Sequence, residues 1–476
     1  MGVGGSRRWG RAGARIAGLL AALTAMAAGP AGAAAPYLRT FLLMGPDGAR
    51  IARAVTSAPD CPSMVVDGRA RPMRVRSPAG TAPQRPTISG PSQSKPSVFA
   101  LTVCEARAPA GARRVSIAGR RLPLPPTDIR RIVVIGDTGC RLKATDGVFQ
   151  ACDDPAAYPF ARVAASAARW KPDLVVHVGD YLYRETACPP DQAACAGSPW
   201  GYGSDAWRAD FLDPAAPLMA AAPLALARGN HETCDRGGQG WRRFLDAHPL
   251  TAQTSCDDPA DDGVGDFSAP FAVPLGGGAQ LILFDSSDTT AAPIAPGDAR
   301  AARYRETYEA IEALARREPH NILVDHHPIL GFAAKRAKSG AIVLLPGNGG
   351  LQSVFGAINP GLVPPNVDFL LSGHIHLWEA VSFSSPHPAQ FIAGFSGTLE
   401  ETVPLPSARP ADATPAPGAV VASLSSWLDG FGFMTLERAG PARWHVQVRD
   451  VSGAVVNTCE VRGSKAQCAK DGVGVR

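Results

Sequence analysis

Short apolar runs alternate with amphipathic stretches through the middle of this chain. Runs that fit buried strands lie at residues 131–135, 174–178, 223–227, 281–284, 321–324 and 367–371. Helical patterns lie between them, rich in alanine at residues 156–170 and charged at 301–316. Strands alternating with helices predict an α/β fold, and the alternating residues 444–448 predict a further strand near the C-terminus.

The segment from residue 36 to residue 126 has a different texture. Alternating runs at residues 40–43 and 98–103 flank a stretch rich in Pro, Ser and Gly at 77–96. This pattern predicts a small all-β domain with one long loop. We therefore expect three parts: a leader at 1–33, an N-terminal β domain at 36–126, and a main domain at 127–476 that includes the C-terminal strands.

The first 33 residues read as a signal peptide. Four arginines precede an apolar run at residues 16–28, and Ala31-Gly32-Ala33 fits a cleavage site. The run is shorter than the roughly 20 residues that a membrane-spanning helix needs, although a retained anchor is the alternative. We expect a periplasmic or secreted protein with no membrane span after removal of the signal.

Composition and charge indicate a globular protein and argue against nucleic-acid binding. The chain has 476 residues, 45% hydrophobic and 19% charged, which is typical of a globular protein of two or three domains. The net charge is +5, but Arg7, Arg8, Arg11 and Arg15 of the leader supply four of these charges. The remaining chain is nearly neutral and shows no basic arm for nucleic-acid binding.

The ten cysteines all follow the leader. An even number in an exported chain predicts disulfides rather than a zinc site. Neighbours pair naturally, although the sequence leaves other connectivities open. The expected pairs are Cys61–Cys104, Cys140–Cys152, Cys188–Cys195, Cys234–Cys256 and Cys459–Cys468.

Five of the strand-like runs end in polar clusters. In open α/β sheets, ligands bind beyond the carboxyl ends of the strands, so these clusters are expected to converge. Taken singly, each has a structural alternative, such as a turn aspartate, a helix cap or a loop histidine. The clusters hold Asp137; Asp180 and Tyr183; Asn230 and His231; His326 and His327; and His374 and His376.

In order, the motifs are Asp-x-Gly, Gly-Asp-x-x-Tyr, Gly-Asn-His-Glu, His-His-Pro and Gly-His-x-His. This series resembles the calcineurin-like metallophosphoesterases. It is most similar to the purple acid phosphatases, because Gly139 stands where most members have His and Tyr183 stands at the phenolate position. The resemblance implies a sandwich of two central β-sheets flanked by helices, with the small N-terminal all-β domain attached.

The resemblance also implies a site for two metal ions. Hard anionic donors suit Fe(III), whereas an amide and imidazoles suit a divalent ion such as iron, zinc or manganese. A hydroxide held by both metals would attack the phosphorus of a small phosphoester. The implied ligands are Asp137, Asp180, Tyr183 and His376 for one metal, and Asp180, Asn230, His326 and His374 for the other.

Several assignments have alternatives. A strict Val-x-x-His spacing selects His327, but we prefer His326 because the family ligand is followed by one residue and then proline. His231 is the candidate proton donor or phosphate contact, or else it orients a ligand. Arg184 and Arg228 are candidate phosphate contacts, or else they pair with nearby acids.

Three functions fit these motifs. The preferred one is an exported phosphomonoesterase of the acid phosphatase type. The second is a phosphodiesterase or nucleotide hydrolase on the same metal site. The third is a non-catalytic binding protein that keeps its metals for structure.

Overall fold

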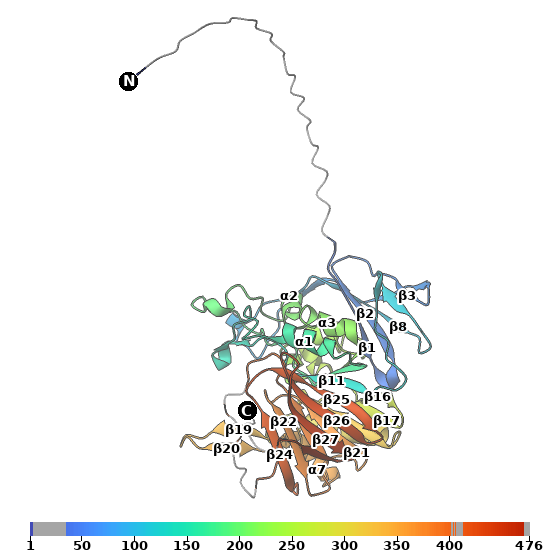
Figure 1. The fold of residues 1–476 in the computed structure, drawn as a ribbon, viewed down its shortest axis with the longest axis vertical. Helices are drawn as coiled ribbons and strands as arrows, with labels where there is room; N and C mark the ends of the chain where they lie inside the picture. The colour runs from blue at the N-terminus through green and yellow to red at the C-terminus, as the bar shows by residue number, and fades with distance from the viewer. Residues whose placement is uncertain (3–34, 401–402, 404, 406–412, 471–476) are drawn as a thin grey trace, which may run out of the picture. The chain divides into compact units, whose positions relative to one another are not determined.

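Two large β-sheets dominate the fold (Figure 1). A computed structural model describes residues 1–2, 35–400, 403, 405 and 413–470. The predicted signal peptide, apart from its first two residues, lies outside the described residues. Among the helices that are described, none combines the length and the apolar character needed to cross a bilayer.

The first sheet has eleven strands and mixes parallel and antiparallel pairs. Its centre is β11, β14 and β15, which run parallel to one another. In order across the sheet, the strands are β28 (Lys465–Cys468), β27 (Val455–Arg462), β26 (Arg443–Asp450), β25 (Gly432–Gly440), β11 (Arg131–Ile135), β14 (Leu174–His177), β15 (Leu224–Leu226), β1 (Leu38–Met44), β2 (Arg50–Thr56), β8 (Thr102–Ala108) and β5 (Arg74–Ser77).

The second sheet has seven strands. Its parallel centre is β17, β18, β21 and β23. In order, the strands are β16 (Phe271–Gly276), β17 (Ala279–Leu283), β18 (His320–Val324), β21 (Val367–Ser372), β23 (Ala389–Ala393), β22 (Trp378–Phe383) and β24 (Val421–Trp427).

Small sheets and short helices complete the structure. The small sheets are β10 (Arg120–Arg121), β9 (Val115–Ile117), β3 (Met64–Val66) and β4 (Arg69–Arg71); β12 (Leu142–Lys143) and β13 (Val148–Phe149); β19 (Ala333–Arg336) and β20 (Ile342–Leu345); and β6 (Gly80–Ala82) and β7 (Ser97–Phe99). The α-helices are α1 (Phe160–Arg169), α2 (Ser204–Trp207), α3 (Ala216–Ala221), α4 (Gly238–Phe244), α5 (Asp262–Gly265), α6 (Ala299–Ala315) and α7 (Gly349–Ile358).

Apolar side chains join these layers. One buried cluster takes residues from both sheets, including Val134 and Val176 of the first and Val324 and Phe369 of the second. A second cluster covers the outer face of the first sheet with α1, and a third covers the outer face of the second sheet with α6 and α7. The two-sheet sandwich with flanking helices is therefore confirmed.

The N-terminal region is all-β, as predicted, but its strands continue the first sheet. Leu43 of β1 pairs in parallel with Leu224 of β15, and β2 and β8 follow outward. The predicted boundary between residues 126 and 127 stays a prediction. All five expected disulfides are present, joining the neighbouring cysteines as predicted.

Candidate metal centre

The predicted ligands follow the parallel strands of both sheets. Asp137 follows β11, Asp180 follows β14 and Asn230 follows β15, and these three strands are neighbours in the first sheet. His326 follows β18 and His374 follows β21, which are neighbours in the second sheet. Because parallel strands end at the same edge, the two sheets deliver these side chains to one place.

Three of these residues have an uncommon backbone conformation. Asp137, Asp180 and His374 have φ values of 53°, 61° and 71°, in the left-handed region that residues other than glycine rarely adopt. Such conformations persist only where the surrounding structure imposes them, and they concentrate at functional sites. The loops around Asp180 are closely packed: a side chain at Gly229 would place its Cβ 2.1 Å from Oδ1 of Asp180.

Tyr183 is at the centre of one group of donors. Its phenol oxygen lies 2.9 Å from Oδ1 of Asp137, 2.8 Å from Oδ2 of Asp180 and 3.1 Å from Nε2 of His376. The other ring nitrogen of His376, Nδ1, donates to the carbonyl oxygen of Leu399 at 2.9 Å. This bond turns Nε2 of His376 toward Tyr183 and Asp137, whose Oδ1 lies 3.5 Å away.

Asn230 is at the centre of a second group. Its amide oxygen lies 3.1 Å from Nε2 of His326 and 3.0 Å from Nδ1 of His374. His326 Nε2 is also 3.1 Å from Oδ2 of Asp180, so Asp180 touches both groups. His326 donates from Nδ1 to the carbonyl oxygen of Val178 at 2.9 Å, which directs its Nε2 into the site.

The chemistry of these donors fits cations. The single proton of the Tyr183 hydroxyl can satisfy only one of the two carboxylates beside it. With its proton on Nδ1, neutral His326 presents a lone pair at Nε2 to the oxygens of Asp180 and Asn230. Burial lowers the pKa of His326, but the Asp180 carboxylate outweighs this effect and raises that pKa to about 10. The surroundings therefore favour a positive charge at this point.

His327 lies at the same site. The ligand atoms of His326, His327 and His374 all lie within 4.8 Å of one another, as do those of Asp137, Asp180 and His326. His327 Nδ1 contacts the hydroxyl of Ser286 at 3.2 Å. Both histidines are close enough to bind a metal, and the choice of His326 stays a prediction.

His231 lies against the Tyr183 ring, with 3.8 Å between ring centroids. Its backbone N–H donates to Oδ1 of Asp180 at 2.8 Å, and its Nδ1 lies 3.0 Å from Oε1 of Glu185. Glu185 in turn accepts from Arg236 at 2.5 Å. Burial and the Arg236 charge lower the pKa of His231. A catalytic role for His231 stays a prediction, with Glu185 in position to orient its ring.

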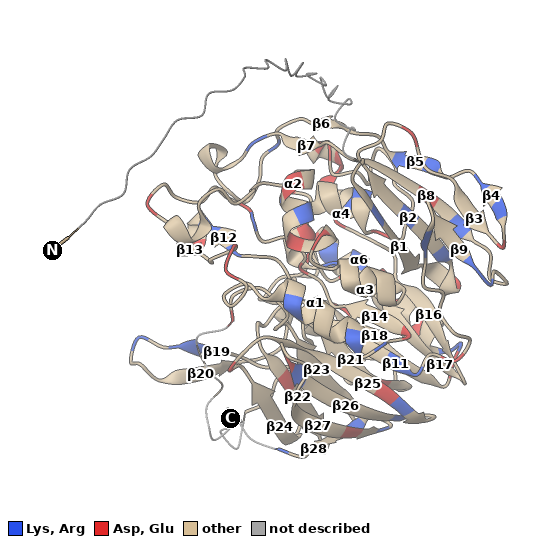
Figure 2. Ribbon diagram, turned by 45° about the horizontal axis from the view of Figure 1, so that its top comes forward, with Lys and Arg blue, Asp and Glu red and all other residues tan. Residues whose placement is uncertain are grey.

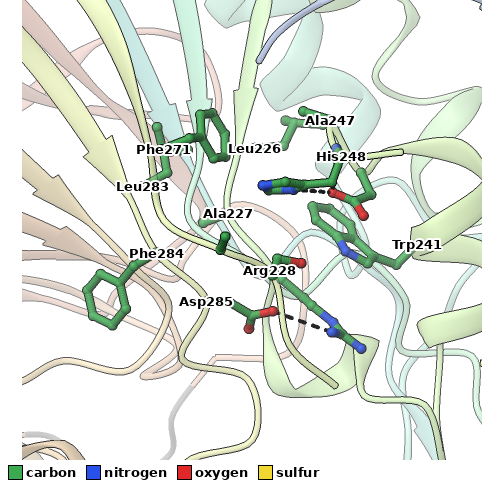
Figure 3. A pocket seen from close by; sticks show the side chains of 13 residues that line it. Leu226, Ala227, Arg228, Trp241, Ala247, His248, Phe271, Leu283, Phe284 and Asp285 are labelled. Carbon is green, nitrogen blue, oxygen red and sulfur yellow. Dashed lines mark hydrogen bonds and ion pairs between the residues drawn. The ribbon is translucent and has the colours of Figure 1, made fainter. Parts of the chain in front are cut away.

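The structure places both candidate arginines against acids. Arg184 donates from Nε to Oδ1 of Asp210 at 2.6 Å. Arg228 donates to Oδ1 of Asp266 at 3.0 Å and to Oδ2 of Asp285 at 3.4 Å, and Figure 3 shows its guanidinium turned toward Asp285. These are the pairings that the sequence left open as the alternative, and phosphate binding by either arginine stays a prediction.

Glu232 is a structural contributor whose function the motif did not reveal. Its carboxylate accepts the backbone N–H groups of Asp180, Tyr181, Leu182 and Gly229 at 3.0, 2.8, 3.2 and 3.1 Å. Burial, with the Asp180 charge, raises the pKa of Glu232 to about 8. Its place after His231 was visible in the sequence, but its bonding partners follow only from the folded loops.

The fold and this group of donors fit a metal-dependent phosphoesterase. The profile of the calcineurin-like phosphoesterase family matches residues 130–377, just over half of the sequence. The chain belongs to the calcineurin-like phosphoesterase family.

Solved structures share the fold. A purple acid phosphatase, PPD1, from yellow lupin (Lupinus luteus) seeds is similar with a TM-score of 0.55 and 14% identity, over 89% of this chain and 74% of that one. PhoD is similar with a TM-score of 0.50 and 11% identity, over 91% of each chain. No curated protein matches this sequence. Family and fold together support a phosphoester hydrolase with a dinuclear metal site.

Proposed function

We propose that the protein is an exported phosphatase that hydrolyses phosphomonoesters at a site for two metal ions. The observation that carries this proposal is the position of the Tyr183 phenol oxygen, within 3.1 Å of donors from Asp137, Asp180 and His376. A phenol among carboxylates is a donor set for a trivalent ion, which distinguishes it from an ordinary divalent site. Five disulfides and the leader pattern support export.

The two donor groups would hold one metal each, with Asp180 shared. Fe(III) suits the tyrosine side, and a divalent iron, zinc or manganese ion suits the asparagine and histidine side. When bound, such a pair acidifies water and neutralises charge that develops at phosphorus. The proposed ligands are Asp137, Asp180, Tyr183 and His376, and then Asp180, Asn230, His326 and His374.

The protein's own groups complete the chemistry. His231 would give a proton to the leaving alcohol, and burial together with Arg236, whose Nη2 lies 2.6 Å from Nε2 of His231, lowers the pKa of this ring. Glu185, 3.0 Å from Nδ1 of His231, would stabilise the protonated ring that gives the proton. Asp137, Asp180 and Tyr183 are buried, which strengthens the electrostatic contacts among these side chains.

The test compares hydrolysis of a chromogenic phosphomonoester with that of the matching diester. The protein is made oxidised, supplied with iron, zinc or manganese, and measured beside Asn230→Ala. Monoester hydrolysis that disappears in Asn230→Ala supports the proposal. A preference for the diester overturns the monoester assignment, and two bound metals without any hydrolysis favour a binding protein.

A further inference from the structure

A cavity of about 480 Å³ adjoins the candidate metal centre. Its walls come from the loop after β18, the β19–β20 hairpin and the start of α7, and they include His327 and His374. The volume is within the range of roughly 300–1,000 Å³ that is usual for small-molecule sites.

The cavity is continuous with the proposed catalytic groups. Nδ1 of His374 lies 3.0 Å from the amide oxygen of Asn230, and the His374 ring is 4.3 Å from the ring of His327. The inner wall of the cavity is thus formed by histidines of the candidate metal centre. A phosphoester held at the cluster has room to extend its alcohol group into this space.

The surface left for a ligand is mainly apolar. Two polar residues in the wall already have partners within the protein. Gln352 donates from Nε2 to the carbonyl oxygens of Ile329 and Pro415, both at 2.7 Å, and the amide oxygen of Asn348 accepts the backbone N–H of Leu351 at 2.9 Å. The apolar wall residues are Pro328, Phe332, Ala333, Leu345, Pro346 and Ile375.

The β19–β20 hairpin, which forms one wall of the cavity, carries positively charged side chains. Lys335, Arg336 and Lys338 are exposed, and residues 333–345 contain no Asp or Glu. Figure 2 shows basic positions in blue on β19, in the hairpin that extends from the body. Basic charge beside a cleft raises the local concentration of anions such as phosphoesters. An anionic phosphate with an apolar group attached fits both features.

We propose that this cavity is the subsite for the substrate's alcohol group and that it selects esters of apolar alcohols, alkyl or aryl. This inference rests on the proposed phosphoesterase function and names its substrate class. Selectivity for apolar alcohols follows because moving each methylene of the ligand from water to the apolar wall lowers the free energy of binding. Esters of sugars and other polyols would lose hydrogen bonds to water there without replacement.

The test uses ethyl, hexyl and 2-phenylethyl phosphate. All are esters of primary alcohols with similar leaving-group chemistry, so differences in kcat/KM report contacts of the alcohol group. We expect the hexyl and phenylethyl esters to exceed the ethyl ester by at least about tenfold, mainly through KM. Leu345→Asn, which keeps the side-chain size but adds an amide, is expected to remove most of this preference.

A second pair of variants separates the cavity from the hairpin. Ala333→Leu adds three carbon atoms in the cavity wall, and Ala341→Leu adds them at the exposed turn of the same hairpin. The first is expected to raise KM for hexyl phosphate several-fold more than KM for ethyl phosphate, while the second changes neither KM.

The outcomes distinguish the subsite from the function. Equal hydrolysis of ethyl and hexyl phosphate retains the phosphatase proposal and overturns the subsite. If no phosphoester is hydrolysed, the proposed function fails, and calorimetric binding of hexylphosphonate and ethylphosphonate to the metal-loaded protein decides the subsite alone. Tighter binding of hexylphosphonate that Leu345→Asn abolishes supports the subsite, and equal affinities overturn it.

Discussion

The phenol oxygen of Tyr183 lies 2.9 Å from Oδ1 of Asp137, although 46 residues separate the two in the sequence. Both side chains are fully buried, and β11 and β14 bring them together as parallel neighbours in the first sheet. A phenol beside carboxylates is a hard, anionic donor set, which is the chemistry that Fe(III) favours. In the proposed site, this contact is what would favour Fe(III) on the tyrosine side.

Replacing Tyr183 with Phe tests this dependence. The ring would keep its packing against His231, so the fold is expected to remain, while the proposed phenol donor to Fe(III) is lost. We expect Tyr183→Phe to lose its visible absorption and most of its bound iron, measured by absorbance and metal analysis. A wild-type protein that is colourless, free of iron and still active would contradict the assignment.

The pair His326 and His327 offers a matched comparison. Of these two residues, His326 contacts both Asn230 and Asp180, at 3.1 Å each, whereas His327 contacts Ser286. We expect His326→Ala to lower the metal content far more than His327→Ala, measured on protein purified under the same conditions. Equal losses would leave the choice of His326 without support.

The sequence could predict that the candidate ligands lie close together, because most of them directly follow strands. The run 131–135 is β11 to the residue, and Asp137, Asp180, Asn230, His326 and His374 each follow a strand that the apolar pattern predicts. The expectation of two metal ions came from the resemblance of the motifs. Neither the strand pattern nor the motifs required knowledge of the long loops.

What could not be predicted depends on contacts between loops. Asp210, in the segment after α2, accepts the backbone N–H of Tyr183 at 2.8 Å and also binds Arg184. The pairing of β1 with β15 likewise joins segments that are remote in sequence. Local periodicity contains no information about such pairings.

The disulfides are expected to differ in their contribution to stability. The bond Cys61–Cys104 closes a loop with a sequence separation of 43, and Cys188–Cys195 one of 7. In the chain-entropy account, these loops correspond to about 4 and about 2.5 kcal/mol. We expect the double alanine variant of the first pair to unfold at lower urea concentration than that of the second. The reverse order would show that strain or denatured-state structure dominates.

His248 predicts a pH dependence of stability. Burial lowers the pKa of His248, but the carboxylate of Asp246, 2.9 Å away, outweighs this and raises it above the ordinary value. A raised folded-state pKa means that protonated His248 stabilises the fold fully below a pH of about 6.5 and loses this effect as pH rises through the folded pKa. His248→Gln should therefore be less stable than wild type at acidic pH, with a gap that narrows toward pH 9, in urea unfolding. If the difference in stability between wild type and His248→Gln grew with pH, the predicted direction of the pH dependence would be wrong.

Glu232 is the strongest candidate for a residue that holds the ligand loops together without binding metal. Four backbone N–H groups, from Asp180, Tyr181, Leu182 and Gly229, donate to its buried carboxylate. A buried donor left without an acceptor costs about 1–3 kcal/mol. We expect Glu232→Ala to lower the free energy of unfolding by at least about 3 kcal/mol.

The metal-free protein is the sharper sample for this measurement, because the loss expected there cannot come from metal binding. Glu309→Ala, at an exposed position of α6, serves as the control and should change stability little. If Glu232→Ala is as stable as Glu309→Ala without metals but binds metal poorly, Glu232 acts on the metals rather than on the loops. A large loss of unfolding free energy in both the metal-free and the metal-loaded protein means that the loops around Asp180 and Asn230 depend on the Glu232 carboxylate for their backbone hydrogen bonds. The positions of the candidate ligands are then set by these loops before a metal binds.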